Sequence, residues 1–87
     1  MDFSVIKRAG LLQHEFSSLV PVSRVTVNNW VRGHKAPHPY ILGRVQTILK
    51  VLEAAIEEGD LPLSKGTTNR SGALKIVMKT TVTRLRS

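Results

Sequence analysis

The chain of 87 residues is long enough for one small hydrophobic core and too short for two independent domains. It has no cysteine, which excludes a disulfide scaffold and thiolate chemistry, and it has no apolar run as long as a signal peptide or a membrane span requires, so we expect a soluble, cytoplasmic protein. Thirteen Lys and Arg against six Asp and Glu give a net charge of +7, an excess typical of proteins with a polyanionic partner.

Two short helices are predicted in the first twenty residues, from apolar side chains at helical spacing. These side chains are Phe3, Ile6 and Leu11 in the first helix and Leu12, Phe16, Leu19 and Val20 in the second. Asp2 or Ser4 would cap the start of the first helix with a side-chain oxygen. The second helix is expected over residues 12–20.

A tight turn and a third helix follow. Pro21 has no amide proton and disfavours helical geometry in the residue before it, so the second helix must end at or before Val20, and Val22 is expected to be buried in the turn. Ser23 is a favoured N-cap residue, and residues 24–32 are expected to be helical up to a stop at Gly33. The apolar positions of this third helix are Val27, Trp30 and Val31.

The longest predicted helix begins near Pro39 and Tyr40 and ends at Gly59, because proline is common in the first turn of a helix. Its apolar residues recur every three to four positions and are Ile41, Val45, Ile48, Leu49, Leu52 and Ile56. Residues 34–39 before it contain two prolines and are expected to be an irregular loop. Residues 61–68 after it are expected to be a linker.

The last segment, residues 71–87, is open to two interpretations. Its Val, Ile and Thr content suits a strand, whereas the helical spacing of its apolar positions favours a helix, which is the interpretation we adopt. The positions on that helical face are Leu74, Val77, Met78, Thr81 and Leu85. The chain is therefore expected to be all-α, a compact bundle of four to five helices.

Residues 12–37 read LQHEFSSLVPVSRVTVNNWVRGHKAP, which resembles the helix-turn-helix of phage Cro and repressor proteins and of the wider xenobiotic-response-element family. The positions that carry the resemblance are Gln13, Ser17, Pro21, Val22, Ser23, Val27 and Trp30. In this pattern a small residue such as Ser17 lies where the two helices cross closely. Pro21 departs from the family's turn glycine, and Val31 departs from its glutamate. The resemblance is weaker over residues 3–58 and absent beyond Leu63, and it implies a lambda-repressor-like fold.

The resemblance implies that residues 23–32 are a recognition helix for the major groove of double-stranded DNA. The residues expected to contact the bases are Arg24, Val25, Asn28 and Asn29. Arginine can donate two hydrogen bonds to guanine, asparagine can exchange a pair with adenine, and valine can pack on a thymine methyl group, so this set can read sequence. Asparagine is a mediocre helix former, and two in mid-helix favour a role beyond solvent exposure.

A second set of residues is expected to contact the DNA phosphates. Its members are Gln13, Ser23, Thr26, Arg32, His34, Lys35 and Arg44, although Arg44 could equally be a free surface charge. Further cations follow residue 60, at Lys65, Arg70, Lys75, Lys79, Arg84 and Arg86. They either form a second phosphate-binding surface or flank a helix whose apolar face binds a partner subunit.

The expected function is sequence-specific binding of double-stranded DNA by a phage or bacterial transcriptional regulator. A repressor is the favoured kind of regulator. Residues 1–60 would be the DNA-binding domain, and residues 61–87 would be a linker and a basic helix for dimerisation or extra DNA contact. A homodimer is expected, because two recognition helices would read half-sites about one DNA turn apart. The alternative is an adaptor or inhibitor that keeps the helical core and binds a host protein.

Other classes of function are disfavoured. No enzyme, metal site, cofactor or small-molecule ligand is expected, because the acidic residues gather at one helix end and the three histidines lack ligand spacing. RNA is a weaker candidate than DNA, because the narrow major groove of A-form RNA excludes a reading helix.

Overall fold

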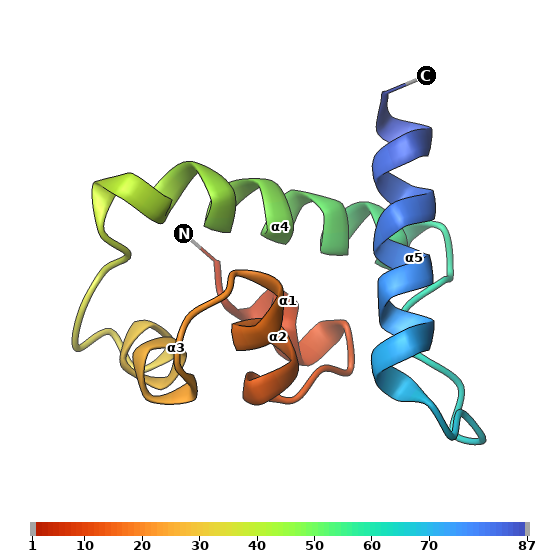
Figure 1. Ribbon diagram of the computed structural model, residues 1–87, viewed down its shortest axis with the longest axis horizontal. Coiled ribbons are helices and arrows are strands. Elements are labelled where there is room, and N and C mark those ends of the chain that lie inside the picture. Colours follow the sequence, from red (N-terminus) through yellow and green to blue (C-terminus); the bar gives the residue numbers. More distant parts are fainter. Residues whose placement is uncertain (1, 87) are drawn as a thin grey trace.

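The computed structural model describes residues 2–86. Its helices are α1 (Ser4–Arg8), α2 (Gln13–Leu19), α3 (Arg24–Val31), α4 (Pro39–Glu57) and α5 (Arg70–Leu85), and no strand occurs among the residues it describes. In Figure 1, α4 lies across the molecule above α1, α2 and α3, and α5 crosses the carboxyl-terminal end of α4. The all-helical prediction is confirmed, and so is the helical interpretation of the final segment up to Leu85; the last predicted residue, Ser87, lies outside the described range.

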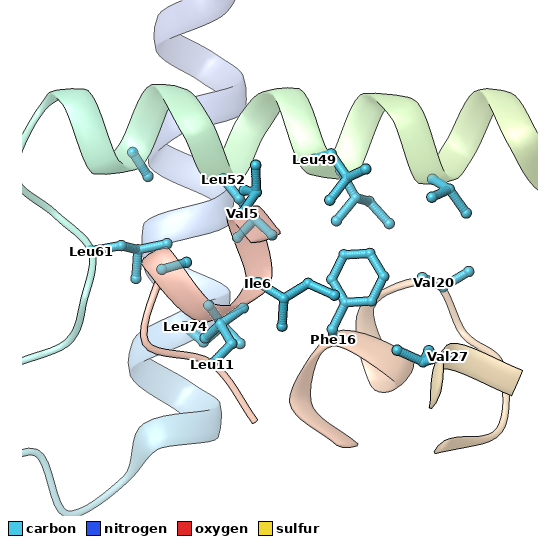
Figure 2. Packing of buried hydrophobic residues seen from close by; sticks show 14 of the residues in the cluster. Val5, Ile6, Leu11, Phe16, Val20, Val27, Leu49, Leu52, Leu61 and Leu74 are labelled. Atoms are coloured by element: carbon cyan, nitrogen blue, oxygen red, sulfur yellow. The ribbon is translucent and has the colours of Figure 1, made fainter. Parts of the chain in front are cut away.

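One cluster of buried side chains connects the helices. Its members are Val5, Ile6, Ala9, Leu11, Phe16, Val20, Val27, Trp30, Val45, Ile48, Leu49, Leu52, Ala55, Leu61 and Leu74. Figure 2 shows Phe16 of α2 below Leu49 of α4, between Ile6 and Val20. Burying one such large apolar side chain contributes about 1.5 to 3 kcal/mol. α1 and α5 pack mainly against α4, whereas α2 and α3 pack mainly against each other.

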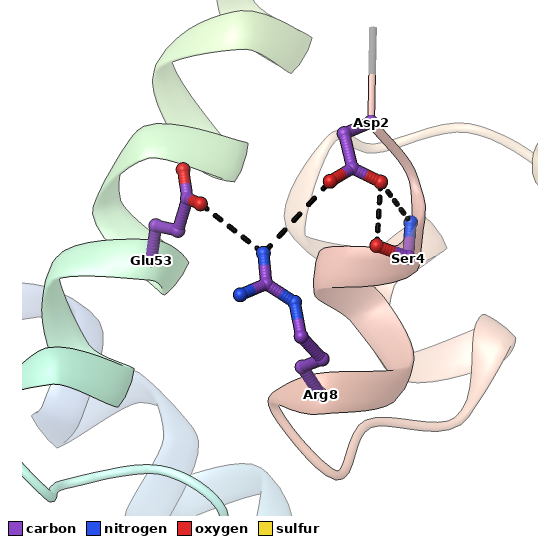
Figure 3. Close-up of polar contacts among 4 residues, drawn as sticks. All are labelled: Asp2, Ser4, Arg8 and Glu53. Carbon is purple, nitrogen blue, oxygen red and sulfur yellow. Dashed lines mark hydrogen bonds and ion pairs between the residues drawn. The ribbon is translucent and has the colours of Figure 1, made fainter.

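Polar contacts hold α1 against α4 (Figure 3). The N-cap residue of α1 is Phe3, which has no capping side chain, rather than the predicted Asp2 or Ser4. Asp2, one residue earlier, accepts a hydrogen bond of 3.0 Å on its Oδ1 from the backbone N–H of Ser4. The hydrogen bonds from Ser4 lower the pKa of the Asp2 carboxyl below its ordinary value. At the other end of α1, Arg8 Nη2 donates to Glu53 Oε1 of α4 at 3.1 Å and forms a longer ion pair of 3.9 Å with Asp2.

The turn between α2 and α3 differs from its predicted geometry in one respect. Val20 keeps helical dihedral angles (φ −67°, ψ −49°), so the expectation that Pro21 would move it out of the helical region is wrong. The helix ends because Pro21, which follows a cis peptide bond, has no N–H to donate. The carbonyl of Ser17 instead accepts the N–H of Val22 at 2.8 Å. Val22 is half-buried rather than buried.

The start of α5 is bound to the start of α2 by one arginine. Arg70 Nε and Nη2 donate to the two carboxylate oxygens of Glu15, at 3.1 and 3.0 Å, and Nη2 also donates to the carbonyl of Gly10 at 2.9 Å. Glu15 in turn accepts the backbone N–H of Leu12 at 2.9 Å. The hydrogen bonds from Arg70, more than any other cause, lower the pKa of Glu15 below its ordinary value.

The predicted linker is not a free connection between two parts. Leu61, immediately after the predicted boundary at residue 60, is buried in the same core as Leu74 of α5. Pro62 lies against the turn between α1 and α2, where Gly10 has a positive φ of 70°. A Cβ at residue 10 would come within 2.5 Å of the Pro62 side chain, so only glycine fits this position without rearrangement.

Three apolar side chains that the helical spacing assigned to buried faces are exposed. They are Leu12 (57% exposed), Val31 (43%) and Leu85 (49%). Leu12 is the extended N-cap residue of α2, so the helical spacing does not apply to it. Val31 lies on the side of α3 that borders an open hollow beside α1. Leu85 lies where α5 extends beyond α4, as Figure 1 shows.

Thr81 is fully buried, and its hydroxyl has no hydrogen-bond partner among the described residues 2–86. Because an unsatisfied buried hydroxyl costs free energy and valine has nearly the same shape, we expect Thr81→Val to increase the free energy of unfolding by about 1 kcal/mol in urea denaturation. Thr80→Val, at an exposed neighbouring position, is the control and should change it by less than about 0.5 kcal/mol. Equal stability of the Thr81→Val variant and the wild type would show that the buried Thr81 hydroxyl does not cost the fold free energy.

The Glu15–Arg70 pair predicts a pH dependence of stability. Since the pKa of Glu15 is lower in the folded chain than in the unfolded one, its contribution is fully present above the unfolded pKa and is lost as the pH falls through the folded pKa. Arg70→Gln should therefore lower the urea midpoint at neutral pH and flatten its decline between neutral pH and about pH 3. Lys75→Gln, on the same helix but without an ion pair among residues 2–86, should keep the wild-type profile. An unchanged profile in Arg70→Gln would count against the role of the pair.

Candidate nucleic-acid interface

The start of α3 is capped as the sequence predicts. Ser23 has extended dihedral angles, and its Oγ accepts the backbone N–H of Thr26 at 3.1 Å. The hydroxyl groups of Ser23 and Thr26 also share a hydrogen bond of 2.7 Å. At the other end, Gly33 adopts a φ of 77°, and its N–H donates to the carbonyl of Trp30 at 3.1 Å. Both predicted ends of this helix are therefore confirmed to within one residue.

The outward face of α3 follows from its buried face. Val27 and Trp30 are buried, and consecutive helical residues are rotated by about 100°, which identifies the opposite side of the helix. The residues on that outward side are Val25, Asn28, Asn29 and Arg32. Val25 is 70% exposed, whereas the two asparagines are half-buried. Of the four residues predicted to contact bases, three lie on this side, and Arg24 lies on its border.

Arg24 lies on the flank of α3 that borders α1 and α2. It lines a hollow of about 380 Å³ together with Gln13, His14 and Lys7. A second hollow of about 510 Å³ continues past the end of α3, between Lys7 and Arg32. Neither hollow has a carboxylate among its lining residues, so this flank is basic along its length.

The opposite flank of α3 faces the loop that leads into α4. Thr26, Asn29 and Lys35 line a smaller hollow of about 250 Å³ there. The loop is folded back onto the end of α3, because the backbone N–H of His34 donates to the carbonyl of Asn29 at 2.9 Å. The structure thus distributes the predicted phosphate contacts over both sides of α3.

Arg44, also predicted to contact phosphate, is not among the residues that line the hollows beside α3. It belongs to α4, and its Nη1 donates to the carbonyl of Val20 at 3.0 Å, at the carboxyl-terminal end of α2. Gln13 lies at the opposite end of α2. Arg44 therefore holds the end of α2 against α4, and a phosphate contact from this residue remains only a prediction.

Five of the six acidic residues form ion pairs with arginines outside α3. The ion pairs are Arg8 with Asp2 and Glu53, Arg70 with Glu15, and Arg84 with Glu58 and Asp60. By contrast, the cations beside α3, Lys7, Arg24, Arg32 and Lys35, are exposed and have no ion pair within residues 2–86. The net positive charge is therefore available to a ligand around α3.

Two residues of this surface were not identified from the sequence, Lys7 and His14. Lys7 reaches α3 because α1 packs against it: the rings of Phe3 and Trp30 stack with centroids 6.0 Å apart. Helical spacing predicts the faces of single helices and carries no information on which helices become neighbours. No signal in the sequence would have placed Lys7 beside Arg24.

Comparison of the chain with models of protein families, with curated proteins and with solved structures finds no match. Within residues 2–86, no helix has the length and apolarity needed to cross a bilayer, and no three His, Asp or Glu side chains are grouped as metal ligands would be. The surface around α3 is therefore the feature of the chain from which its function can be inferred.

The cap of α3 can be tested directly. Ser23→Ala removes the oxygen that accepts the Thr26 N–H, and we expect the free energy of unfolding to fall by about 1 kcal/mol. Ser23→Asp keeps an acceptor at the same position and should restore most of this loss. Urea denaturation of both variants measures the effect, and a fully stable Ser23→Ala variant would show that the cap is dispensable.

Proposed function

We propose that α2, the turn and α3 form a helix-turn-helix that binds double-stranded DNA sequence-specifically, with α3 in the major groove. The observation that carries this proposal is the surface of α3, which has amide and apolar side chains on its outward face. The cations around it have no ion pair within residues 2–86, and no carboxylate lines the hollows of its basic flank. A major groove about 12 Å wide admits a helix of this kind.

Sequence reading is assigned to the outward side of α3. Asn28 and Asn29 offer paired donors and acceptors for adenine, and the exposed Val25 offers an apolar contact for a thymine methyl group. Arg24, at the border of this side, can reach a guanine at the edge of the site. Each good bidentate contact would discriminate against a wrong base by about 1 to 3 kcal/mol.

Backbone contacts are assigned to the two flanks. Gln13 borders α3 on one side, and Thr26 and Lys35 border it on the other, so each flank can face one wall of the major groove. These contacts would set affinity and its salt dependence, because each phosphate neutralised releases bound counterions.

The biological role we propose is a homodimeric regulator of transcription of the phage Cro and repressor type, most simply a repressor. The support for this step is the pattern of residues 12–37 together with the capped α3 that follows the turn. A single short helix reads few base pairs, which favours two copies on a site with two-fold symmetry.

The first experiment is a selection from a randomised pool of duplex DNA at near-physiological salt, followed by sequencing of the retained fraction. An enriched palindromic site would support a dimeric, sequence-specific regulator. Salt-sensitive retention without an enriched sequence would contradict the sequence-reading role of α3. No retention at all would favour the alternative, a helical adaptor that binds another protein.

On the selected duplex, the triple substitution Arg24→Ala, Asn28→Ala and Asn29→Ala should abolish preference for the selected site over a scrambled one. The melting of the variant should remain cooperative, because none of the three side chains is fully buried. The matched control is Gln46→Ala with Lys50→Ala, two exposed polar residues of α4, which should keep the wild-type preference. Preserved preference in the triple variant, measured by fluorescence anisotropy, would disprove the assignment of these three residues.

A further inference from the structure

Three hollows join into one continuous depression, here called the α3–α5 furrow. The hollows of about 380 and 510 Å³ on the basic flank of α3 share Phe3, Lys7 and Val31 among their lining residues. The hollow of about 380 Å³ also shares Leu12 and His14 with a third hollow of about 330 Å³, which lies between α2 and α5. The furrow therefore extends from the end of α3, past the first residues of α2, to Lys75 of α5.

Positive charge follows the furrow along its whole length. Arg32, Lys7, Arg24 and Lys75 line it in that order, and all four are exposed. The one carboxylate among its lining residues is that of Glu15, which is only 9% exposed and is held by both donor groups of Arg70. The accessible charge of the furrow is therefore positive throughout.

The structure also bears on the two interpretations of the basic carboxyl-terminal segment. Leu74 and Thr81 of α5 are buried within the chain's own fold, and Val77 and Met78 pack beside the core, whereas Leu85 at the end of the helix is exposed. Most of the predicted apolar face is therefore already covered, which favours the phosphate-binding interpretation. Arg84 is paired with Glu58 and Asp60. Lys75 has no such partner within the described residues and faces the furrow.

We propose that the α3–α5 furrow holds the sugar-phosphate backbone of the duplex read by α3, with Lys7 and Lys75 as phosphate contacts. This inference rests on the proposed function and adds a contact surface to it. Duplex DNA is the occupant that the charge favours, because its backbone presents regularly spaced negative charges over a distance comparable with the 33 Å length of the molecule. α5 then increases affinity without reading sequence.

The test is the salt dependence of binding to two duplexes of about three helical turns, the selected one and one of arbitrary sequence. The double variant Lys7→Gln and Lys75→Gln should bind both several-fold more weakly, and the slope of log affinity against log salt should be smaller in magnitude by about two, since each lost phosphate contact removes about 0.9. Its preference for the selected duplex should be unchanged. Lys7→Arg with Lys75→Arg should keep the wild-type slope.

The matched control is Lys50→Gln with Lys65→Gln, which removes the same charge away from the furrow. Lys50 lines a separate hollow that also contains Asp2 and Glu53, and Lys65 lies in the segment before α5. The wild-type slope is expected for this control. An equal loss of slope in the control and in the furrow variant would overturn the proposal, as would a wild-type slope in the furrow variant. The arbitrary duplex tests the furrow even if the selection finds no motif, so failure of the furrow and failure of sequence reading give different results.

Discussion

The contact between Arg70 and Glu15 is the constraint that places α5 in this fold. Residues 58–69 contain no helix, so the direction of α5 is set where it touches the earlier helices. Leu74 provides the apolar part of this contact, and the guanidinium of Arg70 provides the directional part, with three hydrogen bonds to Glu15 and Gly10. A bidentate arginine fixes orientation as well as distance, which an apolar contact alone does not.

Ion pairs of this kind also determine how charge is distributed over the molecule. Each arginine that pairs with a carboxylate joins two segments of the chain, as Arg8 joins α1 to α4 and Arg84 joins α5 to the end of α4. Most acidic residues are used in these internal contacts, while most lysines and Arg24 of α3 are left to solvent. The result is a division of the surface, with unpaired cations around α3 and the carboxylates of Asp2, Glu53 and Glu58 elsewhere.

The sequence predicts the bounds and caps of single helices well, but it predicts poorly which helices pack against one another. Particular residues show why. The Ser23 cap, the Gly33 stop and the length of α4 depend on residues within one turn of each other, so they could be predicted from spacing and capping chemistry. The exposure of Leu12 and Val31, the contact of Arg44 with Val20 and the position of Lys7 depend on how helices pack. Such packing brings together residues far apart in the chain, and no periodicity in one segment encodes it.

The 55 residues that separate Glu15 from Arg70 have a consequence for the order of assembly during synthesis. Chains emerge from the ribosome amino terminus first, so α1, α2 and α3 leave it before α5 does. Glu15 and the turn at Gly10 then await Arg70 and Pro62, which emerge later. α3 can therefore form before α5 arrives, and the furrow is complete only when α5 has docked.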